Sequence, residues 1–174
     1  AELIWINVEV EELARDGELV STTLGFQPGL VEALLKGDGS AYEDRDTEMG
    51  LMTPMIRVQE LEVISEPLLI LLRGNAVITI YRRGHATRFQ KFGRYAETAM
   101  KKIKPELPTK DKMTTLVMRF LDENNERNFA GIRPIEDAGE RLSAKLVTVD
   151  EDGNAVAQER KEHQRARSGR ARRG

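Results

Sequence analysis

The most apolar stretch of the chain is "EPLLILLRGNAVITIYRR", from Glu66 to Arg83. Leu68 to Leu72 is a continuous apolar run, Gly74-Asn75 is a two-residue turn signal, and Ala76 to Tyr81 is rich in β-branched residues. This pattern predicts a β-hairpin. Because a continuous apolar run is typical of a strand buried on both faces, we place it in the middle of a sheet with helices on either side.

Shorter patterns precede this hairpin. Leu3 to Glu9 is apolar on both alternating faces and predicts a buried strand. Glu11 to Leu24 has helical composition with a break at Asp16-Gly17, and Gly25 stands where a helix would stop. A short helix is predicted at Pro28 to Lys36, since proline suits the first turn.

The acidic segment Ala41 to Glu48 comes next and predicts a polar loop. Gly50 to Val58 then regains strand character. Pro54 restricts this strand to a sheet edge or a bulge, because proline has no N–H to donate to a neighbouring strand.

From Gly84 to Val149 the pattern changes to helical spacing, and no apolar periodicity returns after Val149. Helices are predicted at Thr87 to Ile103, Thr109 to Asn128 and Pro134 to Val149, separated by "KPELP" and by Gly131 to Pro134. Strands followed by helices predict an α+β fold, an αβα sandwich with a mixed, mostly antiparallel sheet flanked by helices and a helical C-terminal half. We expect one α/β domain over residues 1–149 and a separate tail over 150–174.

Charge is distributed unevenly. The last sixteen residues, from Glu159 to Gly174, carry seven Lys/Arg and two Glu, whereas 20 basic and 27 acidic residues precede them. Such a basic tail is typical of a disordered, solvated segment. An anionic lipid surface, nucleic acid, or a truncated end are the alternatives.

Composition excludes several classes of function. The chain has no cysteine and two histidines, which excludes disulfides, thiolate catalysis and cysteine-based zinc sites. P-loop, Rossmann and nucleophile-elbow motifs are absent, so we expect no enzyme. The longest apolar run is too short to span a bilayer and no secretory signal is recognisable, which favours a cytosolic location.

Two charged clusters carry alternative interpretations. The acidic one comprises Asp38, Glu43, Asp44, Asp46 and Glu48, whose oxygens could suit Mg²⁺ or Ca²⁺. It lacks the EF-hand register, so a solvated loop is favoured.

The basic cluster, Arg82 to Lys104, has eight Lys/Arg and the single acid Glu97, with Phe89, Phe92 and Tyr95 interleaved. Charge and stacking of this kind can bind nucleic acid. Because these aromatic residues share one helix face, anchoring to the sheet is favoured instead.

The order of four segments resembles a known family. "LIWINVE", then "LGFQPGLVEALL", then a strand, then "EPLLILLRGNAVITIYRR" followed by a helical half is similar to the N-terminal cytosolic domain of the CorA magnesium and cobalt transport proteins. The resemblance runs from about Leu3 to Leu146. It implies the soluble, cation-sensing and gating domain of a homopentameric Mg²⁺/Co²⁺ channel, at the cytoplasmic face of the membrane.

The resemblance also implies a regulatory metal site between subunits. Glu32 matches one acid of the family's motif, whereas Ala33 stands where a second acid is expected and Arg119 where a third is expected. Glu32 is therefore the only metal ligand that the resemblance carries over, and Asp38 of the acidic cluster is a weaker candidate. The family's Gly-Met-Asn signature does not occur, and its long stalk helix is expected to be missing after "VDEDGN".

Two hypotheses follow. The first is the regulatory domain of a divalent-cation transporter that associates with other subunits and lacks the membrane pore. The second, less favoured, is a nucleic-acid-binding module that uses the helix from Arg82 to Lys104 and the basic tail.

Overall fold

A computed structural model describes residues 2–37, 39–60 and 62–170, and the side chains of 86–92, 99 and 144–170 lie outside this description. The chain divides into two compact units, Ala1–Ile132 and Arg133–Gly174. The first unit contains the sheet, and the second is helical in its described part. Over the described ranges, every helix is either too short or too polar to cross a membrane.

Five strands and four helices make up the described part of the chain. They are β1 (Ile4–Val10), α1 (Leu13–Thr23), α2 (Leu30–Leu35), β2 (Ala41–Arg45), β3 (Glu48–Gln59), β4 (Glu62–Arg73), β5 (Ala76–Arg82), α3 (Ala86–Lys102) and α4 (Thr109–Arg170). The strands form one sheet in the order β1-β5-β4-β3-β2. β1 runs parallel to β5 and the other pairs are antiparallel, so the mixed, mostly antiparallel α+β fold is confirmed.

The β4–β5 hairpin lies at the centre of the sheet, as predicted. Arg73 pairs with Ala76 across the turn Gly74-Asn75. Gly74 has φ +58° whereas Asn75 does not have a positive φ, which is the type II′ pattern that suits the twist of a hairpin. The two-residue turn therefore sets the register of both strands.

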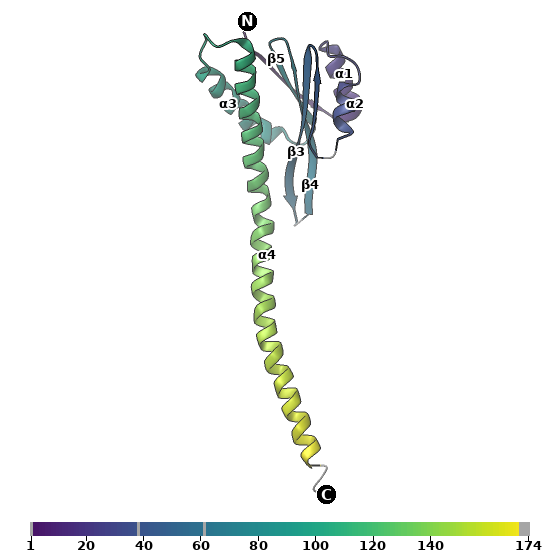
Figure 1. Ribbon diagram of the computed structural model, residues 1–174, viewed down its shortest axis with the longest axis vertical. Helices are drawn as coiled ribbons and strands as arrows, with labels where there is room; N and C mark the ends of the chain where they lie inside the picture. The colour runs from purple at the N-terminus through teal and green to yellow at the C-terminus, as the bar shows by residue number, and fades with distance from the viewer. Residues whose placement is uncertain (1, 38, 61, 171–174) are drawn as a thin grey trace. The chain divides into compact units, whose positions relative to one another are not determined.

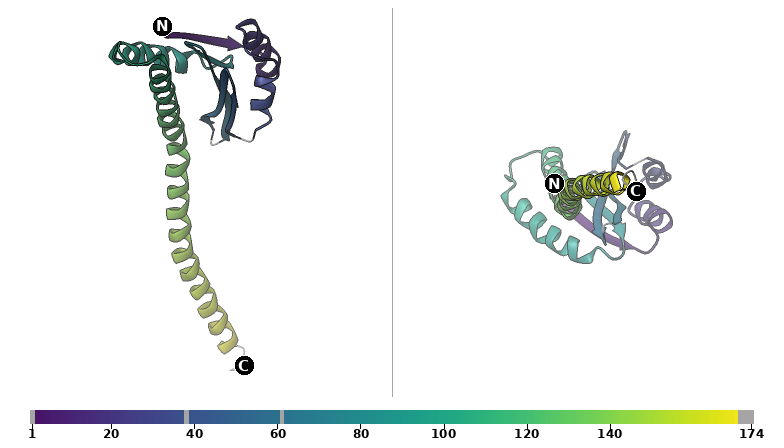
Figure 2. Two further views of the ribbon diagram at one scale, coloured as in Figure 1. Left: turned by 45° about the horizontal axis from the view of Figure 1, so that its top comes forward. Right: turned by 90° about the horizontal axis from the view of Figure 1, so that it is seen from below.

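Helices cover both faces of this sheet (Figures 1 and 2). Along β4, Leu69 and Leu71 belong to the core with α1 and α2, whereas Leu68, Ile70 and Leu72 belong to the core with α3 and α4. All five are at most 7% exposed. Fully burying a leucine or isoleucine is worth about 1.5–3 kcal/mol, so β4 stabilises both layers. The predicted burial on both faces is confirmed.

A row of polar side chains joins β1 to β5. Trp5 Nε1 donates to Thr79 Oγ1 at 3.0 Å, Thr79 Oγ1 donates to Asn7 Oδ1 at 2.6 Å, and Asn7 Nδ2 donates to Tyr81 Oη at 3.0 Å. Burial raises the pKa of the Tyr81 hydroxyl. A register slip of one residue would turn these groups to the other face, so the row specifies the parallel pairing.

The exposed edge of β3 is completed by a helix. β2 pairs with β3 only as far as Met52, and Pro54 lies beyond that point, which confirms the predicted edge position. Asn124 and Asn128 of α4 donate to the Pro54 carbonyl at 2.9 and 2.8 Å, and Ile56 N donates to Asn128 Oδ1 at 2.8 Å. Side-chain amides thus take the place of a neighbouring strand.

Several sequence predictions in the first half are wrong. β1 is an edge strand with Ile4 46% exposed, not a buried strand, because β5 pairs with it on one side only among the described residues. α1 continues through Asp16-Gly17. Gly17 is buried there, close to Val31 of α2 and Leu69 of β4, and a glycine in this place lets α1 pack closely.

The helical half also differs from expectation. α4 continues through the predicted break at Gly131 to Pro134, so the proline, which costs a helix one N–H donor and clashes with the preceding turn, does not end the helix here. The expected absence of a long helix after "VDEDGN" is wrong as well, since α4 extends to Arg170. Residues 150–170 continue α4, and residues 171–174 lie outside the described residues, so the expected division into a domain over 1–149 and a tail over 150–174 stays a prediction.

Replacing Asn128 by alanine should lower the free energy of unfolding by about 2 kcal/mol, because two buried hydrogen bonds to β3 are lost. Urea denaturation followed by circular dichroism measures the change. Asn125→Ala is the matched control, since Asn125 is exposed on the same helix and the gain in helix propensity is the same. Similar losses in the two variants would contradict the edge-completing role of Asn128.

Candidate functional site

The position of Glu32 depends on how α2 packs. Leu30, Val31 and Leu34 are fully buried on one side of this six-residue helix. Gly50 of β3 lies beneath them, where an added Cβ would come within 2.6 Å of Leu34 Cδ1. With the apolar side held against the sheet, Glu32 is turned outward, and its side chain is 69% exposed.

The start of α2 is set by a carboxylate on α1. Gly29 N–H donates to Glu18 Oε1 at 2.6 Å, and Gly29 has φ +79°, a left-handed conformation that favours glycine. α2 therefore begins at Leu30, and Pro28 precedes the helix instead of lying in its first turn. Glu18 thus fixes where on the surface Glu32 is presented.

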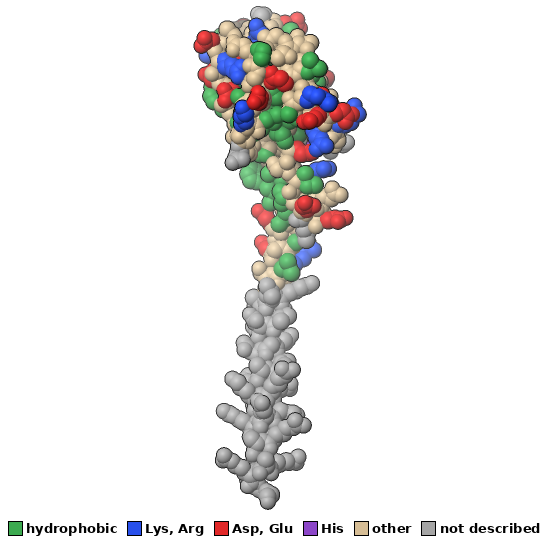
Figure 3. Space-filling model, turned by 90° about the vertical axis from the view of Figure 1, so that its right-hand side faces the viewer, with side chains coloured by type: hydrophobic (Ala, Val, Ile, Leu, Met, Phe, Trp, Pro, Cys, Tyr) green, Lys and Arg blue, Asp and Glu red, His purple; other side chains and the backbone are tan. Residues whose placement is uncertain are grey.

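Glu32 has a basic neighbour one turn further along. Lys36 Nζ lies 2.8 Å from Glu32 Oε1. The hydrogen bond from Lys36, and then its charge, lower the pKa of the Glu32 carboxyl. Both side chains are mostly exposed, so the pair adds little to stability and leaves the carboxylate accessible to a cation. Figure 3, which views the side of α1 and α2, shows acidic and basic side chains interspersed over this face.

The acidic cluster is reorganised by the fold. Asp38 lies outside the described residues. The predicted loop from Ala41 to Glu48 is wrong, because β2 and β3 form a hairpin there. Glu48 is 4% exposed and accepts from Gln27 N with both oxygens at 3.0 Å, so it holds the segment before α2. Within the described residues, His, Asp and Glu do not gather in groups of three that could hold a metal ion.

The other two positions of the implied site lie on different layers. Ala33 lies on α2, which packs on one face of the sheet, and Arg119 lies on α4, which packs on the other. A single chain cannot bring these two positions together. A cation site that combined α2 with this part of α4 would need residues from two chains.

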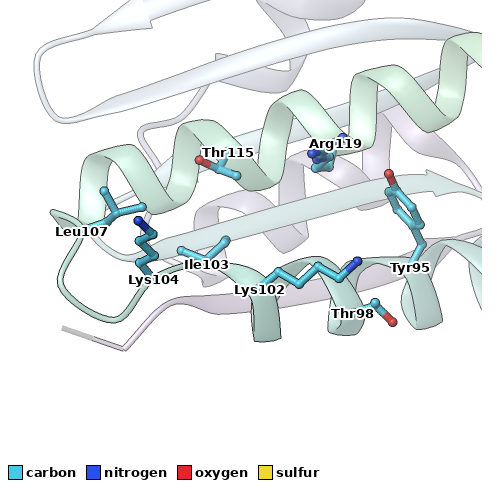
Figure 4. Close-up of a pocket in the computed structure, with 8 residues that line it drawn as sticks. All are labelled: Tyr95, Thr98, Lys102, Ile103, Lys104, Leu107, Thr115 and Arg119. Atoms are coloured by element: carbon cyan, nitrogen blue, oxygen red, sulfur yellow. The ribbon is translucent and has the colours of Figure 1, made fainter.

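A groove separates α3 from the start of α4 (Figure 4). Its volume is about 530 Å³. The described side chains that line it are Tyr95, Thr98, Lys102, Ile103, Lys104, Leu107, Thr115 and Arg119. The groove was not predicted from the sequence, although Tyr95, Thr98 and Lys102 recur at helical spacing on one face.

The prediction that Tyr95 anchors α3 to the sheet is wrong. Ala96, the next residue, is fully buried, which turns Tyr95 about 100° away from the core. Tyr95 is 38% exposed and borders the groove. The side chains of Phe89 and Phe92, which were expected to share its face, lie outside the described residues.

Replacing Lys36 by methionine should raise the pKa of Glu32 toward its ordinary value of 4.5, because the hydrogen bond and charge that lower it are removed. In the unsubstituted chain the ion pair stabilises the fold above pH 4.5. This stabilisation is lost as the pH falls through the lowered pKa of Glu32. A carboxyl ¹³C NMR titration measures the shift. Lys101→Met on α3 is the control, and an unchanged Glu32 titration in Lys36→Met would contradict the ion pair.

Two solved structures share this fold. The soluble domain of CorA from Methanocaldococcus jannaschii aligns with a TM-score of 0.56 at 18% identity, covering 84% of this chain and 56% of that one. The complete CorA magnesium transporter from the same organism aligns with a TM-score of 0.59 at 18% identity, covering 84% and 44%. The present chain thus spans about half the length of these proteins, and at this identity the likeness shows the fold alone.

Comparison with curated proteins finds no significant match. The family model for the CorA-like Mg²⁺ transporter protein, however, matches residues 1–169. This match covers nearly the whole chain and agrees with the segment order of the sequence. The chain therefore belongs to the CorA-like Mg²⁺ transporter family.

Proposed function

We propose that this chain is a cation-sensing, gating domain of a divalent-cation transporter, and that the conducting pore is formed by another part of the assembly. Family membership over residues 1–169 carries this proposal. The sandwich supports it, because its cores lie between the sheet and the helices and leave Glu32 outside them. We place the domain at the cytoplasmic face of the membrane.

Glu32 is the proposed regulatory ligand for Mg²⁺ or Co²⁺. Carboxylate oxygens suit Mg²⁺, which usually keeps several waters and takes one or two carboxylates. One exposed carboxylate binds a divalent cation weakly, so further ligands must come from elsewhere. Asp38, six residues along the chain, is a second candidate, and a neighbouring subunit is the other source.

The physical scheme is relief of repulsion between subunits. Carboxylates from two chains repel one another across an interface, and a cation bound between them removes that repulsion. Loss of the cation would then loosen the interface and shift the population of arrangements toward an open one. Lys36 competes with the divalent cation for the Glu32 carboxylate. It therefore weakens cation binding, so that a higher concentration of Mg²⁺ or Co²⁺ is needed for the same response.

Mg²⁺ or Co²⁺ at about ten times its Kd should stabilise the chain by about 1.4 kcal/mol, a rise in Tm of roughly 3 °C. Glu32→Gln should abolish this rise because the charged ligand is gone. Lys36→Met should shift the response to lower cation concentration. Thermal melts followed by circular dichroism measure all three.

Glu97→Gln is the control, since Glu97 is an exposed acid on α3 in the opposite layer. Equal cation responses of Glu32→Gln and Glu97→Gln would show nonspecific screening and refute a site at Glu32. Analytical ultracentrifugation tests the intersubunit part separately. An unchanged sedimentation coefficient with and without cation, despite a raised Tm, would refute the site between subunits and leave a site within one chain.

A further inference from the structure

The groove between α3 and α4 gathers positive charge. Lys102, Lys104 and Arg119 line it together, and its described lining includes no Asp or Glu. None of the three forms an ion pair with another described residue. Three unneutralised cations around one depression create a positive potential that attracts an anion.

Other lining groups add acceptors and an aromatic ring. The Thr98 hydroxyl donates to the Arg94 carbonyl at 2.9 Å, and the Thr115 hydroxyl donates to the Asp111 carbonyl at 2.8 Å. Each hydroxyl oxygen therefore still offers lone pairs to a ligand that carries O–H or N–H donors. In Figure 4 the Tyr95 ring extends from α3 toward α4, and the Lys102 side chain runs along the groove toward it.

The far end of the groove is closed by a braced turn. Lys112 Nζ donates to the Pro105 carbonyl at 2.7 Å, and Leu107 N donates to the Lys104 carbonyl at 3.2 Å. These bonds hold the connection between α3 and α4, which carries Ile103, Lys104 and Leu107. The groove is thus lined in part by a loop with fixed hydrogen bonds, which places the Lys104 ammonium group next to the side chains of Ile103 and Leu107.

We propose that this groove binds a nucleoside polyphosphate. The cations suit the phosphates, the threonine oxygens suit ribose hydroxyl or base amine donors, and the Tyr95 ring suits the flat apolar base. The volume of about 530 Å³ lies within the range of roughly 300–1,000 Å³ of small-molecule sites. A bare phosphate would leave the acceptors and the ring unused.

This ligand goes beyond the proposed cation sensing and does not depend on it, because Glu32 lies in the other helical layer. A nucleotide in the groove would tie α3 to α4 and neutralise their mutual repulsion. Binding would therefore stabilise this layer of the sandwich without any divalent cation.

Isothermal titration of the full chain with ATP, at low ionic strength and without divalent cations, tests the proposal. We expect saturable one-to-one binding with Kd below about 1 mM. Tripolyphosphate should bind at least about tenfold more weakly, since it lacks the base and ribose. No saturable binding, or tripolyphosphate binding as tightly as ATP, would overturn the proposal.

Variants locate the site. Lys102→Met combined with Arg119→Met should weaken ATP binding at least about tenfold. Tyr95→Leu should weaken ATP binding but leave tripolyphosphate binding unchanged. Lys101→Met is the matched control, because Lys101 is an exposed lysine on the same helix that does not line the groove.

All these positions are on the surface, and circular dichroism in the absence of ligand confirms the fold of each variant. A loss in Lys101→Met equal to that in the double variant would show a diffuse charge effect and overturn the site. Glu32→Gln should bind ATP normally, so a failure of cation sensing and a failure of nucleotide binding are distinguishable.

Discussion

The structure depends on one constraint, which is that the central β4–β5 hairpin is apolar on both faces. Leu68 to Leu72 alternate between two cores, so neither face of the sheet can be left to water. α1 and α2 must therefore cover one face, and α3 with the first part of α4 the other. The helices of the first unit form these two layers.

The same constraint keeps the two candidate sites apart. Glu32 is presented by the layer of α1 and α2, whereas Arg119 and the groove belong to the layer of α3 and α4. A cation at Glu32 needs oxygen ligands, and a groove of three unpaired cations among the described residues attracts anions. The proposed cation ligand and the proposed anion groove thus lie in different layers of one chain.

Polar side chains determine the parts of the fold that the apolar pattern does not, which are the pairing of β1 and the free edge of β3. The row from Trp5 to Tyr81 specifies the parallel pairing of β1, and the Trp5 ring also packs against Phe120 of α4, with centroids 5.1 Å apart. Asn124 and Asn128 complete the edge of β3 where β2 ends. The Trp5–Phe120 contact and the two asparagines tie α4 to β1 and to β3, so the helix that lines the groove is itself held in place.

Short-range signals in the sequence determined the central hairpin with its Gly74-Asn75 turn, the edge position of Pro54, the helices α2 and α3, and the family resemblance. Turn chemistry and apolar periodicity act over a few residues, so these features can be predicted locally.

Only the tertiary structure decided the roles of several other residues. Gly17 became a packing site for α1, Glu48 an internal acceptor for Gln27, and Tyr95 a wall of the groove, since each role is set by a residue distant in sequence. Glu32 could be named from its motif, but its exposure and its separation from Arg119 follow from the layer in which each helix packs.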